Sequence, residues 1–109
     1  MQFLIISNPK FQVPPEMLGP VLDGFIAYLT KYTESGNIRE SWSFAGRVGG
    51  MALIEVDSHE QLDAILAESP VGPFSEIEIH ALVDLVDSVK VGKQVLQSRM
   101  EAMAKMGGG

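Results

Sequence analysis

The hydrophobic and polar residues of this chain alternate with two different periods, which predict strands and helices in a regular order. Short apolar runs or strict alternation predict β-strands at residues 2–8, 38–45, 51–56 and 76–82. Apolar residues three and four apart predict amphipathic helices between Pro14 and Ser35 and between Asp57 and Pro70. The predicted order is β-α-β-β-α-β, the split arrangement of an α+β, ferredoxin-like fold with a four-stranded antiparallel sheet.

The last predicted strand, residues 76–82, alternates most clearly. Glu76, Glu78 and His80 share one face, and Ile77 and Ile79 share the other, because successive strand side chains point to opposite sides. A one-residue slip would turn two glutamates and a histidine toward the helices. We therefore expect the two isoleucines to face the helices and the polar set to face away.

The other face of the sheet is expected to be bare, because both helices of this arrangement cover the same side. Leu53 and Trp42 are candidates for this face, and alternation from residue 38 places Ile38 and Glu40 beside the tryptophan. Monomers rarely expose a large apolar patch. We therefore expect a homodimer or higher homo-oligomer in which two sheets pack face to face, an arrangement that can leave a cavity in each half.

A third amphipathic helix is predicted at residues 86–106, with Val89, Leu96, Met100 and Met103 on one stripe. We expect this stripe to be buried against the domain or a partner subunit, since methionine-rich faces adapt to irregular surfaces. The expected organisation is thus a ferredoxin-like domain at residues 1–83 and a C-terminal helical extension at residues 84–109.

Composition narrows the classes of function. The 109 residues carry a net charge of −6 and no cysteine. The scattered basic residues argue against a nucleic-acid partner, which would need clustered lysine and arginine. No apolar run approaches the length that spans a bilayer, and the first residues make a poor signal peptide, so we expect no membrane partner. A cysteine-free chain fits a reducing compartment, and we expect a cytoplasmic protein.

The candidate chemistry centres on His80 and Glu78, which lie two residues apart on one strand face. A histidine beside a carboxylate in a desolvated cavity can move a proton near neutral pH. The alternative is a solvated strand end with no catalytic part. Glu76 is either a second carboxylate of the site or a salt-bridged residue at its rim.

No metal or cofactor is expected from the sequence. His59 and His80 are the only histidines, and their spacing matches no metal-ligand pattern. The glycine-rich stretch at residues 46–50 leads into a strand, so it offers no helix N-terminus to a phosphate.

Residues 36–82 resemble the muconolactone isomerase family. The resemblance is carried by Gly36, by W-x-x-x-G-R from Trp42 to Arg47, by V-D-S at residues 56–58, and by P-F-S-E-I-E-I at residues 73–79. It implies a dimeric α/β barrel, a pocket inside each sheet, and a cofactor-independent proton transfer on a lactone. Arg47 is the matching residue that can hold an anionic group.

The chain departs from the family pattern at three places. The acidic residue that the resemblance places in the first helix falls at Phe25, and the tyrosine after the G-R pair falls at Val48. The basic segment after the last strand becomes the acidic stretch at residues 84–87. The resemblance therefore carries the fold further than the reaction.

Our leading hypothesis is an isomerase or cyclase for a small, largely apolar, cyclic or polyketide-like substrate. His80 and Glu78 would be catalytic, and Trp42, Arg47, Leu53 and Glu76 would bind the substrate. One alternative is a non-catalytic ligand-binding or assembly dimer whose last helix engages a partner. Another is a cofactor-free monooxygenase of the same fold.

Overall fold

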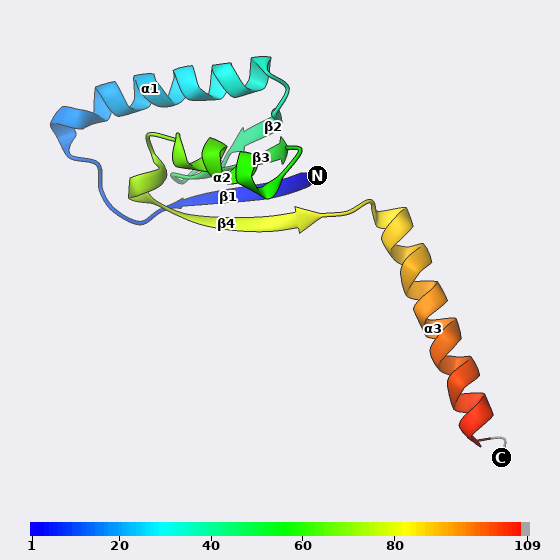
Figure 1. Ribbon diagram of the computed structural model, residues 1–109. Helices are drawn as coiled ribbons and strands as arrows, with labels where there is room; N and C mark the ends of the chain where they lie inside the picture. The colour runs from blue at the N-terminus through cyan, green and yellow to red at the C-terminus, as the bar shows by residue number, and fades with distance from the viewer. Residues whose placement is uncertain (108–109) are drawn as a thin grey trace.

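The computed structural model describes residues 1–107, in which strands and helices follow the predicted order (Figure 1). The last two residues of the predicted extension lie outside the described part. The elements are β1 (Gln2–Pro9), α1 (Pro15–Glu34), β2 (Ile38–Ser43), β3 (Gly50–Glu55), α2 (His59–Ala67), a short 3₁₀ helix η1 (Gly72–Phe74), β4 (Ser75–Leu82) and α3 (Leu85–Gly107).

The four strands form one sheet in the order β2-β3-β1-β4, with each adjacent pair antiparallel. Helices α1 and α2 lie on the same face of this sheet, as Figure 1 shows. The predicted α+β, ferredoxin-like architecture is therefore confirmed. We call the side that carries α1 and α2 the helix face, and the other side the open face.

Helix α1 is bounded by residues suited to its ends. Pro15 occupies the first turn, where a missing amide hydrogen costs nothing. Pro20 lies inside the helix without ending it. After the last residue, Gly36 adopts a φ of 84°, the left-handed conformation that glycine commonly takes after a helix end.

Helix α2 begins with a capping box formed by Ser58 and Gln61. The Ser58 hydroxyl accepts a hydrogen bond from the Gln61 amide at 3.1 Å, and the Gln61 side-chain oxygen accepts one from the Asp57 amide at 2.7 Å. These bonds satisfy amide groups that a helix start leaves without partners. They fix the residue at which α2 begins.

The core lies between the helix face and the two helices. Strand residues from all but β4 and residues from both helices contribute its buried side chains. The buried apolar residues are Phe3, Ile5, Tyr28, Ile38, Ile54, Val56, Leu62 and Ile65.

A β-bulge in β2 corrects one expectation about side-chain direction. Ile38 pairs with Ile54, yet Glu40 pairs with Leu53, so an extra residue stands between them. Ile38 consequently points to the helix face, where it is buried. The expectation that it shares a face with Glu40 and Trp42 is wrong, because simple alternation does not continue through a bulge.

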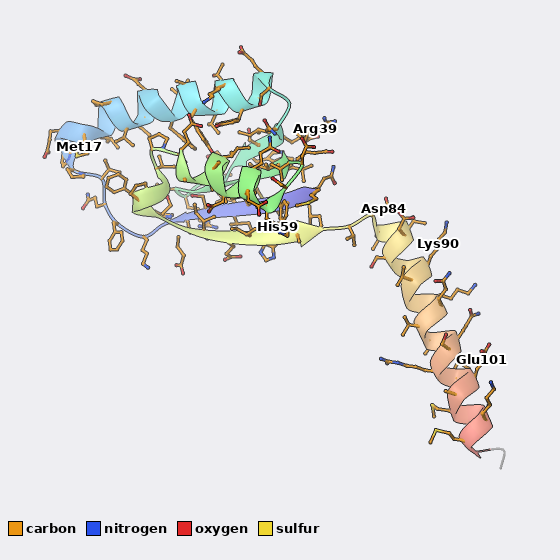
Figure 2. All side chains as sticks on the ribbon, in the orientation of Figure 1. Met17, Arg39, His59, Asp84, Lys90 and Glu101 are labelled. Carbon is orange, nitrogen blue, oxygen red and sulfur yellow. The ribbon has the colours of Figure 1, made fainter. Side chains whose placement is uncertain are left out.

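Helix α3 leaves the end of β4 and extends away from the body on the side opposite α1 (Figure 1). All of its residues are exposed, and its side chains project into open space (Figure 2). The molecule is consequently 75 Å long and only 27 Å by 25 Å in its other two dimensions. Burial of the α3 stripe against its own domain, one of the two expectations, is not observed.

Candidate functional site

A cavity of about 640 Å³ opens between α1 and the helix face of the sheet. Its floor follows from strand register, which lines up small residues of β1, β3 and β2 in two adjacent rows. The rows are Ser7–Gly50–Ser43 and Ile5–Ala52–Ser41. Because most of these side chains are short, α1 lies over a space that larger strand residues would fill.

The wall opposite this floor is apolar and comes from α1. Leu22, Phe25 and Leu29 line it, and the Phe25 ring stacks on the ring of Tyr28 with centroids 6.1 Å apart. The Tyr28 hydroxyl donates a hydrogen bond to the Ile65 carbonyl at 2.8 Å. Burial, together with the nearby Tyr32 and Glu68, raises the pKa of Tyr28 to about 12. Tyr28 therefore stays protonated and ties α1 to α2.

Arg47 brings the one charged side chain to the lining, from the loop between β2 and β3. Its Nη1 donates to Asn8 Oδ1 at 2.9 Å, and its guanidinium lies over the Phe44 ring at 4.1 Å. The loop reaches this shape through Gly49, which has a φ of 120°. A Cβ on Gly49 would stand 2.7 Å from the Ser7 carbonyl oxygen, so only glycine fits there.

The polar groups of the lining suit binding more than proton transfer. Hydroxyls come from Ser7, Ser41, Ser43, Ser69, Ser75 and Tyr28, and the positive charge comes from Arg47. Among the described residues that line the cavity there is no histidine, aspartate, glutamate or lysine. The cavity can therefore hydrogen-bond the oxygens of a ligand and attract an anion, while it contributes no ordinary general base.

The structure separates the predicted site residues onto the two faces of the sheet. Arg47 and Trp42 belong to the cavity lining. The Trp42 side chain, however, alternates with those of Ser41 and Ser43, so its indole lies on the open face, where it is half-exposed. Leu53 pairs with Leu4 and also lies on the open face.

His80, Glu78 and Glu76 keep the predicted parity and lie together on the open face, since they pair with Leu4, Ile6 and Asn8 in turn. His80 Nε2 and Glu78 Oε2 are 3.2 Å apart, and both side chains are about half-exposed. The sheet stands between this pair and the cavity. One bound molecule in this chain does not touch both sets.

The two internal departures from the family pattern both fall in the cavity. Phe25 lines its α1 wall, and Val48 lines its loop side. The positions at which the resemblance places an acid and a tyrosine are thus filled by apolar side chains. This cavity is correspondingly less polar than the resemblance implies.

Sequence reasoning missed the serine floor and Tyr28. Ser41 and Ser43 share the strand face opposite Trp42, and Ala52 and Gly50 follow with the same period of two. Small residues at alternate positions of two paired strands are a usable signal of space beneath a helix. The signal becomes legible only when the register that pairs the two strands is known.

Two other features are absent from residues 1–107. No group of three or more histidine, aspartate or glutamate side chains there is arranged to hold a metal ion. None of the helices in that range combines the length and apolar character needed to cross a membrane.

Comparison with known proteins gives a family match and several similar proteins. The family model described as muconolactone delta-isomerase matches residues 1–87. Muconolactone Delta-isomerase of Acinetobacter baylyi is 32% identical over 56 residues, which cover 51% of this chain and 58% of that protein. Muconolactone Delta-isomerase 2 of Acinetobacter lwoffii is 29% identical over 59 residues, which cover 54% of this chain and 62% of that protein.

Two solved structures are similar in fold. A crystal structure of muconolactone isomerase superposes with a TM-score of 0.72 at 23% identity, over 77% of this chain and 90% of the other. A 5-chloro-2-hydroxyhydroquinone dehydrochlorinase from Burkholderia phenoliruptrix, solved with 2,5-dihydroxybenzoquinone, superposes with a TM-score of 0.56 at 16% identity. That match covers 76% of this chain and 94% of the dehydrochlorinase.

Proposed function

Because this chain belongs to the muconolactone delta-isomerase family, we propose that it is a cofactor-independent isomerase or cyclase. Its substrate is a small, mostly apolar cyclic molecule that binds in the cavity beneath α1. The single observation that carries this proposal is the cavity itself, which joins an apolar α1 wall to a floor of hydroxyl groups. Such a combination binds the body of a ring by desolvation and orients its oxygens by hydrogen bonds.

The substrate class follows from what the lining offers. Arg47 supplies one positive charge at the loop side, where it is held by Asn8 and Phe44. Phe25 and Val48 make the remaining wall apolar. We therefore favour a ring that carries a carbonyl or hydroxyl oxygen and at most one anionic group. A lactone or a hydroxyquinone meets this description.

The reaction we propose is a shift of a double bond in such a ring. A proton passes from the carbon next to the carbonyl to a water molecule, because the part of the lining that the structure describes holds no carboxylate or imidazole. The electron pair of that C–H bond moves into the ring, and water returns a proton to the carbon two positions further on. Hydrogen bonds to the carbonyl oxygen stabilise the negative charge that develops there. Ser41, Ser43 and Arg47 are the groups placed to make such bonds.

We propose His80 and Glu78 as a proton shuttle because His80 Nε2 lies 3.2 Å from Glu78 Oε2. This pair serves a substrate on the open face, and that arrangement is our second candidate. It requires another molecule to cover the open face, since both side chains are about half-exposed here. For this reason we also propose that the working form is a homodimer or higher homo-oligomer.

The test is isomerisation of an unsaturated γ-lactone without a carboxylate, α-angelica lactone, followed by NMR in D₂O. We expect deuterium uptake and double-bond migration faster than in buffer. Arg47→Ala should reduce the rate if the cavity is the site, and His80→Ala should reduce it by about 10²–10⁴-fold if the open face is the site. Binding of 2,5-dihydroxybenzoquinone, measured by calorimetry, reports occupancy without turnover.

Each result points to one conclusion. Loss of activity in Arg47→Ala alone supports the cavity, and loss in His80→Ala alone moves the chemistry to the open face. Binding of the quinone without turnover of any lactone favours a ligand-binding module. No binding and no turnover would refute the proposed function.

A further inference from the structure

The cavity beneath α1 has a mouth and an inner end, which differ in burial. At the mouth, Ser41 and Ser43 of the edge strand β2 and Arg47 of the following loop are exposed. The inner end lies toward α2, whose connection to β4 contributes Ser69 to the lining. Ser69 is only 9% exposed and is the only buried non-aromatic residue with a polar side chain among residues 1–107. The inner end therefore holds a polar group that is shielded from bulk solvent.

The Ser69 hydroxyl has no partner among the residues that the structure describes. It takes part in none of the side-chain hydrogen bonds of residues 1–107. By contrast, the Ser75 hydroxyl donates to the Val71 carbonyl at 2.8 Å. No side-chain oxygen or nitrogen in that range is both enclosed by protein and unpaired, so the Ser69 hydroxyl meets open space, which is the cavity that it lines. Buried hydroxyl groups are normally paired, and this one keeps a donor and an acceptor for a ligand.

Hydrogen bonds on both sides fix the backbone of Ser69. Its amide donates to the Leu66 carbonyl at 3.2 Å, and its carbonyl accepts from the Gly72 amide at 3.1 Å. Pro70 follows directly, and a proline restricts the backbone of the residue before it. The Cα–Cβ bond of Ser69 therefore has a fixed direction relative to the cavity.

The neighbours of Ser69 attach this segment to α1. Glu68 Oε1 lies 2.6 Å from Lys31 Nζ, and Glu68 also accepts a hydrogen bond from the Tyr32 hydroxyl. A Cβ on Gly24 would stand 3.7 Å from Pro70 Cγ, so the helix backbone passes close to the proline. These contacts hold the segment against α1 on either side of the serine. Such a hydroxyl is preorganised, because a ligand has little left to order when it binds.

The two polar ends of the cavity are separated by about the length of a substituted ring. Strand β3 lies between β2 and β1, so Ser41 and Ser43 stand about 10 Å from β1. Helix α2, which precedes Ser69, packs over β1, where the His59 ring contacts the Phe3 ring with centroids 5.8 Å apart. A six-membered ring with oxygens on opposite carbons bridges such a gap with a hydrogen bond of about 2.8 Å at each end. The apolar lining between the ends suits the ring itself.

We propose that Ser69 is a second hydrogen-bonding subsite, which binds an oxygen on the side of the substrate ring opposite the oxygen held at the mouth. The ligand class is a ring with a carbonyl or carboxylate oxygen at one end and a hydroxyl or carbonyl oxygen across from it. A serine hydroxyl both donates and accepts, so it pairs with either kind of oxygen. This inference rests on the proposed function, since it takes the cavity as the place where the ring binds.

Three benzoates test the subsite, because they share a carboxylate for Arg47 and differ only across the ring. The affinities of benzoate, 4-hydroxybenzoate and 4-methylbenzoate for the isotope-labelled full chain are measured by NMR titration. We expect 4-hydroxybenzoate to bind about threefold to tenfold more tightly than the other two, which is the contribution of one neutral hydrogen bond. 3-Hydroxybenzoate, whose hydroxyl is misplaced for Ser69, should bind like benzoate.

Ser69→Ala removes the hydroxyl and leaves the cavity open. This variant should bind 4-hydroxybenzoate about threefold to tenfold more weakly than the wild type does, and 4-methylbenzoate at least as tightly, so that the preference between the two reverses. Ser69→Thr keeps a hydroxyl and should keep the preference. Because the hydroxyl has no protein partner to lose, Ser69→Ala should not lower the melting temperature of the free protein, whereas the loss of a structural hydrogen bond would lower it.

The outcomes separate the subsite from the proposed function. A preference for 4-hydroxybenzoate that Ser69→Ala reverses supports the subsite. Equal binding of all the benzoates by the wild type, or a preference that survives Ser69→Ala, overturns the subsite and leaves the cavity as a site for rings. A preference for 3-hydroxybenzoate overturns the placement of the second oxygen across the ring. If none of the benzoates binds at tens of millimolar, both the subsite and the cavity as a ring-binding site are refuted.

Discussion

Filling the cavity should raise the free energy of unfolding and weaken ligand binding at the same time. Ala52 lies at the centre of the cavity floor, paired with Ile5 on one side and Ser41 on the other. Ala52→Ile adds three carbon atoms that point into empty space beneath α1. Isoleucine also suits a strand better than alanine does.

The magnitude follows from burial. Each fully buried methylene contributes about 0.8 kcal/mol, so three contribute about 2.4 kcal/mol at most. Because the cavity is open on one side, the added carbons are only partly buried. We therefore expect the free energy of unfolding to rise by about 1 kcal/mol. For a domain of this size that corresponds to a rise of about 4–8 °C in the melting temperature.

Binding should change in the opposite direction. A single methylene misplaced in an apolar pocket alters affinity or rate by about 10–200-fold. We therefore expect 2,5-dihydroxybenzoquinone to bind Ala52→Ile at least about tenfold more weakly by calorimetry, and lactone turnover to fall in parallel.

The matched control is Ala81→Ile, the same substitution on the same face. Ala81 lies on the edge strand β4, where it pairs with Phe3 of β1, and it is outside the cavity lining. It should leave probe binding unchanged. If Ala52→Ile binds the quinone as tightly as the wild type, the cavity is not the binding site. If it instead lowers the melting temperature, the space beneath α1 is not empty in solution.

Three further predictions concern the cavity wall and its support. Muconolactone itself should be a poor substrate, and Phe25→Glu combined with Val48→Tyr should raise its turnover, as rate assays of both proteins will show. Tyr28→Phe should cost about 1–2 kcal/mol at pH 7, because the Ile65 carbonyl loses its buried donor. Since burial raises the pKa of Tyr28 to about 12 while an unfolded tyrosine titrates near 10, this difference in unfolding free energy should shrink as pH rises from 10 to 12. Hydrogen bonds from Lys31 and Tyr32 lower the pKa of Glu68. Glu68→Gln should therefore lower the melting temperature at neutral pH. The difference from the wild type should disappear in melts at acid pH, once the carboxylate of the folded wild type is protonated.

The parts of the fold that depend on local pattern were predictable from the sequence. The capping of α2 by Ser58 and Gln61 needs only their spacing. The parity of Glu78 and His80 needs only strand alternation, and the register of β1 with β4 confirms it. These signals are local because each rests on the geometry of one helix turn or one strand.

The bulge after Ile38 and the position of the cavity were not predictable in this way. A bulge reverses the face to which the side chains before it point, and nothing in the alternation of residues 38–45 marks its position. The cavity depends on which small residues of different strands stand side by side. We expected the pocket on the open face, near His80, because the apolar patch there was visible in sequence. The space beneath α1 arises from non-local pairing of Ser7, Gly50 and Ser43.

Residues that match the family pattern and residues that depart from it lie in different parts of the structure. The matching residues build the scaffold: Gly36 follows the end of α1, and the W-x-x-x-G-R stretch forms the end of β2 and the loop that carries Arg47. The departures at Phe25 and Val48 lie in the lining of the cavity. A fold is kept by its turns and core, whereas specificity changes with a few wall residues. Replacing Phe25 and Val48 therefore tests which substrate the cavity accepts while the residues that build the fold stay unchanged. Arg47 matches the family pattern and lies beside Val48 in the lining. We therefore expect Arg47 to bind both muconolactone and the substrate of this chain.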